Sequence, residues 1–263
     1  MTYVGFECSA APASVALWRD GKLLGEFFCN VAVTHSQTLL PMFDALLESC
    51  NVGIDEIDGY CISSGPGSFT GIRIGISAVK GLAAAKSLPC AGVSTLLGIA
   101  NGVLPYEGPI AAVMDARCDQ FYCALFLSDG EKIIRIFDDM ALSRAELCGK
   151  ITEVSAKYDK KVLLAGDGAT VFYKGFKSDE LPPVRLAPES CRYQSARAVI
   201  TAACPSFKNG NTVMPKELLP VYLRLPQAQR ELKAGRENQK PKIKQSESQK
   251  KEKIKPKTEA YAK

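Results

Sequence analysis

The sequence is poor in the residues on which metal and acid–base chemistry most often depend. His35 is its single histidine, and its ten cysteines include no C-x-x-C pair, the closest two being Cys118 and Cys123. A two-histidine mechanism is therefore excluded, and so is a zinc ribbon, which needs two close cysteine pairs. Most of the cysteines stand in apolar stretches, so we expect reduced core thiols in a cytoplasmic protein that holds no metal.

The chain also lacks the long apolar run that a membrane helix requires. Its longest uncharged stretch, residues 87–106, contains two prolines and three glycines, which argue against a spanning helix. No basic start followed by an apolar run is present, so no secretory signal is expected. The sequence therefore predicts a protein without a membrane partner.

Charge of both signs is present but unevenly spread. The chain has 33 basic and 28 acidic residues, a formal net charge of +5. Residues 227–263 hold 12 of the basic and 5 of the acidic residues, which leaves residues 1–226 with a net charge of −2. We expect this basic tail to be mostly disordered, because it has few apolar residues to bury. It would be either merely solvated or a non-specific contact for nucleic-acid phosphates.

The first 105 residues are predicted to begin with three strands, a helix, a strand and a helix. The Asp20-Gly21 dipeptide between the second and third strands is a strong hairpin signal. The first helix begins at Thr34, which stands at capping-box spacing from Gln37, and its apolar face consists of Leu39, Leu40, Phe43, Leu46 and Leu47. In order, we expect strands 3–8, 14–18 and 22–29, a helix from 34, strand 60–64, a helix of about 16 residues, strand 91–93 and a helix from 94.

The second half starts again with strands. The predicted elements are strands 109–114, 120–127 and 132–137, a helix over 143–158, strand 161–165, a Gly166-Asp167-Gly168 turn into a helix, and a last helix over 194–203. A repeated unit of three strands, helix, strand and helix implies mixed sheets covered by helices. The arrangement predicts an α/β protein with the duplicated actin-like ATPase (ASKHA) fold. Its domains would be residues 1–105 and 106–226, followed by the tail 227–263.

The most informative segment is the glycine turn between strand 60–64 and the next helix. The turn consists of Gly65, Pro66, Gly67 and Ser68. A P-loop would need Lys-Ser or Lys-Thr where Ile72-Arg73 stands, and a dinucleotide-binding fingerprint would need closer glycines and a later acid. Both fail, which leaves a helix start that receives an anion, or a tight turn in which Ser68 or Thr70 caps the helix.

Two features of the helix after this turn are not explained by helix capping alone. Arg73 lies in the first helical turn, where the helix dipole disfavours a cation, so we expect an anionic partner in this chain, in a ligand or in another chain. Gly71, Gly75 and Ala78 leave one stripe of the helix nearly bare. Such a stripe would let another helix approach closely, within the chain or across an interface.

At this segment the sequence resembles the TsaB (YeaZ) family, which takes part in making N6-threonylcarbamoyladenosine (t6A) in bacterial tRNA. The resemblance covers about residues 3–225 and is most specific over Ser64-Gly65-Pro66-Gly67-Ser68-Phe69-Thr70-Gly71-Ile72-Arg73-Ile74-Gly75. Further family-like motifs lie at residues 35–41, 114–117 and 220–224. The family usually has Asp-Thr-Ser after the first strand, where this chain has Glu7-Cys8-Ser9.

The resemblance implies an actin-like fold shared with the catalytic paralogue TsaD, to which TsaB proteins bind. TsaD carries two metal-binding histidines, and its pattern places Thr95 and Ile99 at those positions here. The implied role is a non-catalytic scaffold or activator that forms a heterodimer with TsaD, engages the ATPase TsaE, and is required for threonylcarbamoyl transfer to adenosine 37 of tRNA. Docking is expected through helices 34–50 and 71–86, with contact residues His35, Leu39, Gly71, Ile72, Arg73, Gly75, Ile76 and Val79.

The loops that would hold a nucleotide in this fold are degenerate. The first hairpin turn, residues 9–13, has no glycine or lysine, and the second, residues 115–119, is acidic and has no glycine. Carboxylates and Cβ atoms there would repel or crowd a phosphate, so we expect no catalytic residue, no cofactor and no activity of the chain alone. Two alternatives stay open: an independent ATPase or glycoprotease-like hydrolase of the same fold, and a homodimer formed through the same helices.

Three smaller features have structural interpretations as well as functional ones. We expect His35 to pack or hydrogen-bond at the helix start, and Asp115 to pair with Arg117. The Gly166-Asp167-Gly168 turn is either a helix entry or a vestigial adenosine loop. The extended apolar segment 220–224 packs either on this chain or on a partner.

Overall fold

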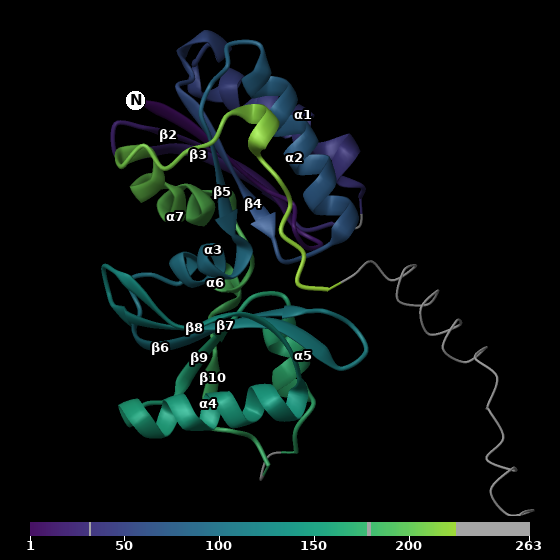
Figure 1. Cartoon of the computed structure of the whole chain (residues 1–263), viewed down its shortest axis with the longest axis vertical. Helices are drawn as coiled ribbons and strands as arrows, with labels where there is room; N and C mark the ends of the chain where they lie inside the picture. Colours follow the sequence, from purple (N-terminus) through teal and green to yellow (C-terminus); the bar gives the residue numbers. More distant parts are fainter. Residues whose placement is uncertain (32, 178–179, 225–263) are drawn as a thin grey trace, which may run out of the picture. The chain divides into compact units, whose positions relative to one another are not determined.

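The computed structural model describes residues 1–31, 33–177 and 180–224, so the predicted basic tail lies outside the described residues (Figure 1). The strands are β1 (Thr2–Glu7), β2 (Ala13–Arg19), β3 (Lys22–Cys29), β4 (Gly59–Gly65), β5 (Cys90–Ser94), β6 (Glu107–Asp115), β7 (Gln120–Asp129), β8 (Ile133–Ser143), β9 (Val162–Ala165) and β10 (Val184–Leu186). The helices are α1 (His35–Cys50), α2 (Phe69–Ala84), α3 (Thr95–Gly102), α4 (Arg144–Tyr158), α5 (Gly168–Lys174), α6 (Glu189–Arg192) and α7 (Ala196–Lys208), with 3-10 turns η1 (Ile54–Glu56) and η2 (Pro215–Glu217).

Two five-stranded sheets have the same strand order. The first runs β3-β2-β1-β4-β5, and the second, read in the same sense, runs β8-β7-β6-β9-β10. In each sheet the three strands that come first in the chain are antiparallel neighbours. The next strand, β4 or β9, pairs parallel to the first of them, β1 or β6. Phe6 lies beside Ile62 in the first sheet as Ala112 lies beside Ala165 in the second. This duplication is the actin-like fold that the repeated element order predicts.

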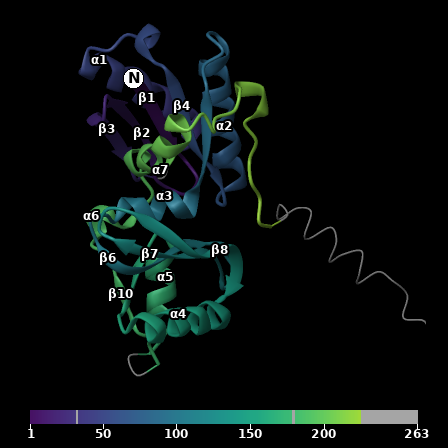
Figure 2. The same ribbon diagram turned by 60° about the vertical axis from the view of Figure 1, so that its left-hand side comes forward.

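Helices cover both faces of each sheet (Figures 1 and 2). In the first half α1 and α2 bury Leu39 and Ile72 against Phe6, while α7 packs Ile200 on the opposite face. In the second half α4 and α5 form one layer, and α3 covers the other face with Leu96. Each such fully buried side chain contributes about 1.5–3 kcal/mol of hydrophobic free energy, so the amphipathic faces fix which helix covers which sheet.

Most predicted elements lie where the sequence places them, with differences at their ends. Strand β8 continues to Ser143, because its bulged pairing with β7 extends beyond Phe137. The short elements β10 and α6 are not predicted, since three or four residues show no periodicity. The capping box at α1 is wrong: the Thr34 side chain makes no capping hydrogen bond, and the Gln37 N–H donates to the Thr34 carbonyl oxygen at 2.9 Å.

The end of the described chain returns to the first sheet. Helix α7 packs against β1, β2, β4 and β5, and Val213 pairs with Cys90 at the edge of β5. Residues 1–224 form one compact unit. The division into domains 1–105 and 106–226 stays a prediction, but residues 196–224 pack largely on the half that precedes the predicted boundary.

The ten cysteines are free thiols, and Cys118 alone among them is exposed. Burial raises the pKa of the Cys8, Cys61 and Cys123 thiols, the last to about 12, so these three stay protonated. Within residues 1–31, 33–177 and 180–224, no helix is long and apolar enough to cross a membrane.

Candidate functional site

The glycine turn joins β4 to α2 and is closed by contacts with two distant segments. Gly65 has a φ of +132°, and a Cβ there would overlap the Val221 carbonyl oxygen. A Cβ on Gly67 would lie 2.8 Å from the Ser9 Cβ. Ser68 caps α2 by accepting the Gly71 N–H at 3.2 Å. The predicted serine cap is therefore confirmed, and both glycines are required because other backbone passes directly over them.

Three amides at this helix start donate to groups of this chain. The Ser68 N–H donates to the Ser9 carbonyl oxygen at 2.6 Å, and the Ile72 N–H donates to the Ser68 carbonyl oxygen at 2.9 Å. Together with the Gly71 N–H, these donors point into the protein's own structure. The turn thus fastens α2 to the β1–β2 turn, because the Ser68 N–H, which an anion-binding loop would leave open, is taken up by Ser9.

The loop after β1 is filled by a buried carboxylate. Glu7 is 1% exposed, and its carboxylate accepts the Ser9 N–H at 2.6 Å and the Ser63 hydroxyl. Burial raises the pKa of Glu7, and these hydrogen bonds act in the opposite direction. Glu7 stands where the family resemblance leads us to expect an aspartate, and both of its oxygens are occupied by groups of this chain.

The equivalent turn of the second half, between β6 and β7, is open and differently built. Arg117, Cys118 and Asp119 all have left-handed backbone, with φ of 62°, 54° and 54°. The Arg117 N–H donates to Asp115 at 2.7 Å, so the predicted Asp115–Arg117 pair uses the backbone amide. Asp119 forms the ion pair of this turn, accepting from Arg144 Nε at 2.8 Å.

The Gly166-Asp167-Gly168 turn is a helix entry, as the simpler of its two interpretations predicts. It leads into α5, and a Cβ on Gly168 would lie 2.5 Å from the Met114 backbone carbon. The Asp167 carboxylate accepts from Gln194 Nε2 at 2.6 Å. Burial raises the pKa of Asp167 to about 6.

Most of the predicted partner contacts are core residues of this chain. Leu39, Ile72, Ile76 and Val79 are at most 5% exposed and belong to the core beneath α1 and α2. His35 lies at the start of α1, where its Nε2 donates to the Ala10 carbonyl oxygen at 2.8 Å. The four apolar side chains therefore pack beneath α1 and α2, and His35 is hydrogen-bonded within the chain.

The bare stripe of α2 faces inward as well. A Cβ on Gly71 would overlap the Cys8 carbonyl oxygen, and one on Gly75 would meet the Cys8 sulfur and lie 2.6 Å from Ile62 Cδ1. Gly71 and Gly75 let α2 approach strands β1 and β4, so the close approach occurs within the chain and not to another helix. Gly81 is the glycine of α2 that faces out, with no atom within 4 Å of an added Cβ.

Arg73, the one exposed member of the predicted contact set, has partners that the sequence did not indicate. Its Nε donates to the Tyr222 hydroxyl at 2.9 Å, and its guanidinium carbon lies 3.9 Å from the centre of the Phe69 ring. The rings of Phe69 and Tyr222 are 4.8 Å apart. The expected anion is thus replaced, within the described residues, by a hydroxyl group and two aromatic faces.

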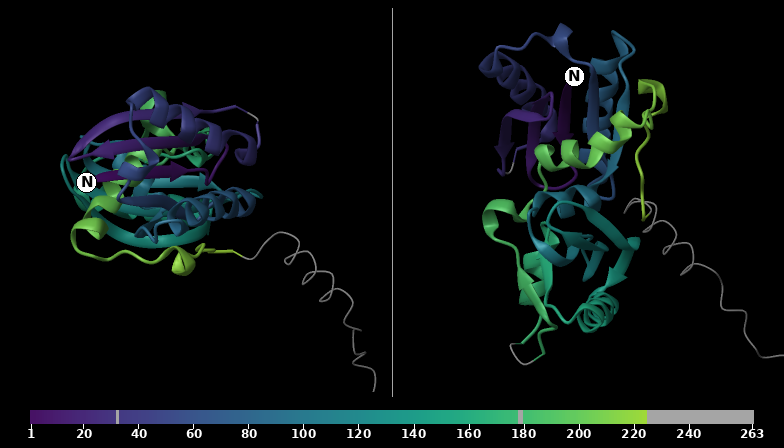
Figure 3. Two further views of the ribbon diagram at one scale, coloured as in Figure 1. Left: turned by 90° about the horizontal axis from the view of Figure 1, so that it is seen from above. Right: turned by 90° about the vertical axis from the view of Figure 1, so that its left-hand side faces the viewer.

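Tyr222 belongs to a segment that we call the C-terminal strap, Val213–Arg224, which runs beside α2 (Figure 3). The Val221 N–H donates to the Ser64 carbonyl oxygen at 2.7 Å. Arg224 donates from Nη1 to the Ala116 carbonyl oxygen at 3.0 Å and so reaches the second half. Of the two interpretations of segment 220–224, packing on this chain is the one seen, although Val221 and the preceding Leu219 stay 49% and 65% exposed.

Comparison with known proteins agrees with this topology. Residues 30–258 match the family model described as "TsaD: tRNA N6-adenosine threonylcarbamoyltransferase". The tRNA threonylcarbamoyladenosine biosynthesis protein TsaB of Escherichia coli (strain K12) is 30% identical over 227 residues, which cover 85% of this chain and 95% of that protein. The tRNA N6-adenosine threonylcarbamoyltransferase of Thermosipho africanus (strain TCF52B) is 31% identical over 113 residues, 37% of this chain and 34% of that protein.

Among solved structures, YeaZ from Pseudomonas aeruginosa superposes with a TM-score of 0.71 at 26% identity, covering 84% of this chain and 99% of that one. Fold and matches together define an actin-like α/β protein of the tRNA threonylcarbamoyladenosine biosynthesis group. Within that group, the chain belongs to the TsaB family.

Proposed function

We propose that this chain is a non-catalytic scaffold or activator subunit. It binds a TsaD-type transferase and is required for threonylcarbamoyl transfer to adenosine 37 of tRNA, in the cytoplasm. TsaE and tRNA would join the resulting heterodimer, with the basic tail 227–263 as one contact for tRNA phosphates. Support comes from the family relationship, from the closed first loop and from the outer surface of the first half.

The closed loop after β1 is the observation that carries the non-catalytic part of this proposal. An ATPase of this fold must present open backbone donors to phosphate where Ser9, Gly67 and Ser68 are hydrogen-bonded or packed against each other. The Glu7 carboxylate fills the adjoining space. The residues at the two expected histidine positions, Thr95 and Ile99, are at most 1% exposed and lie in the core.

The docking part of the proposal uses side chains that the structure leaves exposed on α1 and α2. Thr70, Ser77 and Gly81 form a small-residue stripe on the outside of α2, and Leu40 of α1 is 43% exposed although it belongs to the predicted apolar face. A stripe of small residues permits close helix packing, and an exposed apolar side chain such as Leu40 favours an interface. A second copy of this chain would use the same surface, so homodimer and heterodimer would compete.

A reconstituted tRNA-modification assay tests the proposal. With a TsaD-type transferase, TsaE, ATP, the threonylcarbamoyl donor system and unmodified tRNA, omission of this chain should reduce t6A formation at least tenfold. Unchanged t6A formation without the chain would contradict the scaffold role.

The enzyme alternative makes a different prediction about the purified chain alone. An independent ATPase or hydrolase would bind ATP or a metal ion and turn over nucleotide without partners. Calorimetric titration with ATP, together with metal analysis and a phosphate-release assay on the same sample, separates the two functions. ATP turnover by the chain alone would favour the enzyme.

A further inference from the structure

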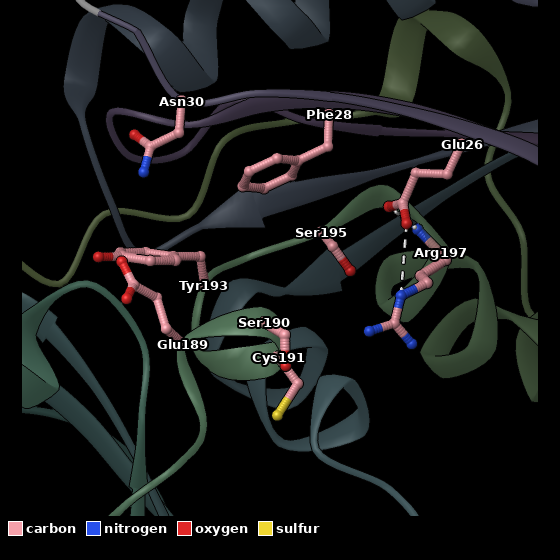
Figure 4. Close-up of a pocket in the computed structure, with 9 residues that line it drawn as sticks. All are labelled: Glu26, Phe28, Asn30, Glu189, Ser190, Cys191, Tyr193, Ser195 and Arg197. Atoms are coloured by element: carbon pink, nitrogen blue, oxygen red, sulfur yellow. Dashed lines mark hydrogen bonds and ion pairs between the residues drawn. The ribbon is translucent and has the colours of Figure 1, made fainter.

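A pocket lies on the opposite side of the first sheet's hairpin from the docking helices. It has a volume of about 430 Å³ and lies between β3, α6 and the start of α7 (Figure 4). Small-molecule pockets generally measure about 300–1,000 Å³, so this one could hold a ligand of nucleoside size. Neither the proposed docking surface nor the closed first loop includes any of its side chains.

Two aromatic side chains enter the pocket from different walls. Phe28 projects from β3, and Tyr193 projects from the segment that follows α6 (Figure 4). Phe28 is 46% exposed, which is unusual for a phenylalanine within a strand. Among the described residues, neither ring stacks on another aromatic ring. Two unpartnered aromatic faces favour a planar ligand, because stacking on them stabilises any flat π-system.

The deep wall of the pocket is polar and already ordered. The Glu26 side chain is 16% exposed and lies 3.3 Å from Arg197 Nε, and it also accepts the Arg197 N–H at 3.0 Å. Ser195 is 8% exposed, and its hydroxyl lies near enough to the Glu26 carboxylate to oppose the rise of that group's pKa, but it makes no hydrogen bond of ordinary length among the described residues. A buried hydroxyl without a partner is costly, so a ligand group that bonds to it would gain affinity.

Charge restricts the class of ligand. The lining holds two carboxylates, Glu26 and the exposed Glu189, and a single guanidinium, that of Arg197, so it carries a net charge of −1. Such a lining repels phosphate and carboxylate groups and accepts N–H donors. A neutral heteroaromatic ring with N–H groups satisfies both the aromatic walls and the carboxylates.

We propose that this pocket binds a phosphate-free purine base or nucleoside, stacked between Phe28 and Tyr193 with its polar edge toward Glu26 and Ser195. This ligand class goes beyond the proposed scaffold function and does not depend on it. A phosphorylated nucleotide or an RNA base would carry the same ring into the pocket but bring charge to a negative rim. The two sources are therefore distinguishable by their phosphate groups.

Titration of the full chain with adenosine, followed by calorimetry or NMR, tests the proposal. Adenosine should bind, ATP and oligoadenylate should bind at least tenfold more weakly, and Tyr193→Ala or Phe28→Ala should weaken adenosine binding at least tenfold. Ile134→Ala, which truncates a 62% exposed residue on β8, is the control and should bind like the unaltered chain.

Ser195→Ala keeps the test decisive if an aromatic variant folds poorly. Ser195 precedes α7 but makes no capping hydrogen bond with its side chain, so its removal should leave the melting temperature unchanged or raised. Adenosine affinity should fall about three- to tenfold, as expected for one lost hydrogen bond. No binding at about 5 mM adenosine, well above a millimolar Kd, would overturn the proposal. ATP binding as tight as adenosine binding, or affinity unaffected by all three variants, would overturn it too.

Discussion

The two halves of the molecule share a strand order and a helix-entry turn, yet they use that turn differently. Gly65-Pro66-Gly67 follows β4, and Gly166-Asp167-Gly168 follows β9, the equivalent strand. In both turns the second glycine packs against backbone at the end of the first strand of its sheet, near Ser9 in one half and near Met114 in the other. The duplication is therefore visible in local geometry as well as in topology.

The residue between the two glycines differs, and so do the surroundings. In the first half, Pro66 lies in a turn that the C-terminal strap covers. In the second half, Asp167 is a half-buried carboxyl held by Gln194. The outer helices differ as well, since α2 exposes small residues while α4 carries the Lys150–Glu153 ion pair. The same fold thus carries an outer helix surface suited to close packing in the first half and one suited to contact with water in the second half.

The largest expected effect is on the free energy of unfolding, when an inward-facing and an outward-facing glycine of α2 are each replaced by leucine. Gly75→Leu should lose at least about 3 kcal/mol of unfolding free energy, because overpacking against Cys8 and Ile62 adds to strain in a tight core. Gly81→Leu, with open space around it, should be neutral or more stable by about 0.5–1 kcal/mol, since glycine is a poor helix former. Urea denaturation measures both. Equal stability of the two variants would contradict the inward orientation of Gly75.

A smaller, pH-dependent effect should distinguish the second turn. Because burial raises the pKa of Asp167 to about 6, its contribution to stability is present below pH ~4 and is lost as pH rises through 6. Asp167→Asn, which does not titrate, should therefore be more stable than the unaltered chain by about 3 kcal/mol at pH 8 and similar to it at pH 4.

Asp129 serves as a control because its pKa is shifted in the opposite direction. Hydrogen bonds from the Lys132 and Glu131 amides lower its pKa, so its contribution is present at neutral pH and is lost on acidification. Asp129→Asn should be less stable than the unaltered chain at pH 8, with the difference disappearing near pH 3. If the difference in unfolding free energy between Asp167→Asn and the unaltered chain did not change with pH, the pKa of the Asp167 carboxyl would not be shifted.

The smallest effect concerns the contact between α2 and the C-terminal strap. Tyr222→Phe removes the hydroxyl that accepts from Arg73 and should cost about 0.5 kcal/mol, while Arg73→Ala also removes the contact with Phe69 and should cost about 1 kcal/mol. Hydrogen exchange at Val221 should increase in both variants. Unchanged exchange would mean that Arg73 does not help to hold the strap.

Local patterns in the sequence predict much of the fold, because strands and helices with a buried face repeat their apolar residues at fixed periods. The serine cap at Ser68 and the helix entry at Gly166-Asp167-Gly168 are predictable for the same reason: each depends on neighbouring residues. The orientation of Gly75 is not, since whether a bare stripe faces a strand or another chain depends on tertiary packing. The partners of Arg73 and Asp167 lie 149 and 27 residues away, and no local pattern pairs them.

The central claim is that the outer face of α2, and not the equivalent outer surface of the second half, binds the transferase. Gly81 in α2 and Gly149 in α4 allow a matched test, because both are exposed helical glycines with no atom within 4 Å of an added Cβ. The measurement is the Kd for a TsaD-type transferase of Gly81→Leu and Gly149→Leu, each first shown to be folded. We predict at least a tenfold rise in Kd, about 1.4 kcal/mol, for Gly81→Leu and no change for Gly149→Leu. An unchanged Kd for Gly81→Leu, or a rise confined to Gly149→Leu, would contradict the account.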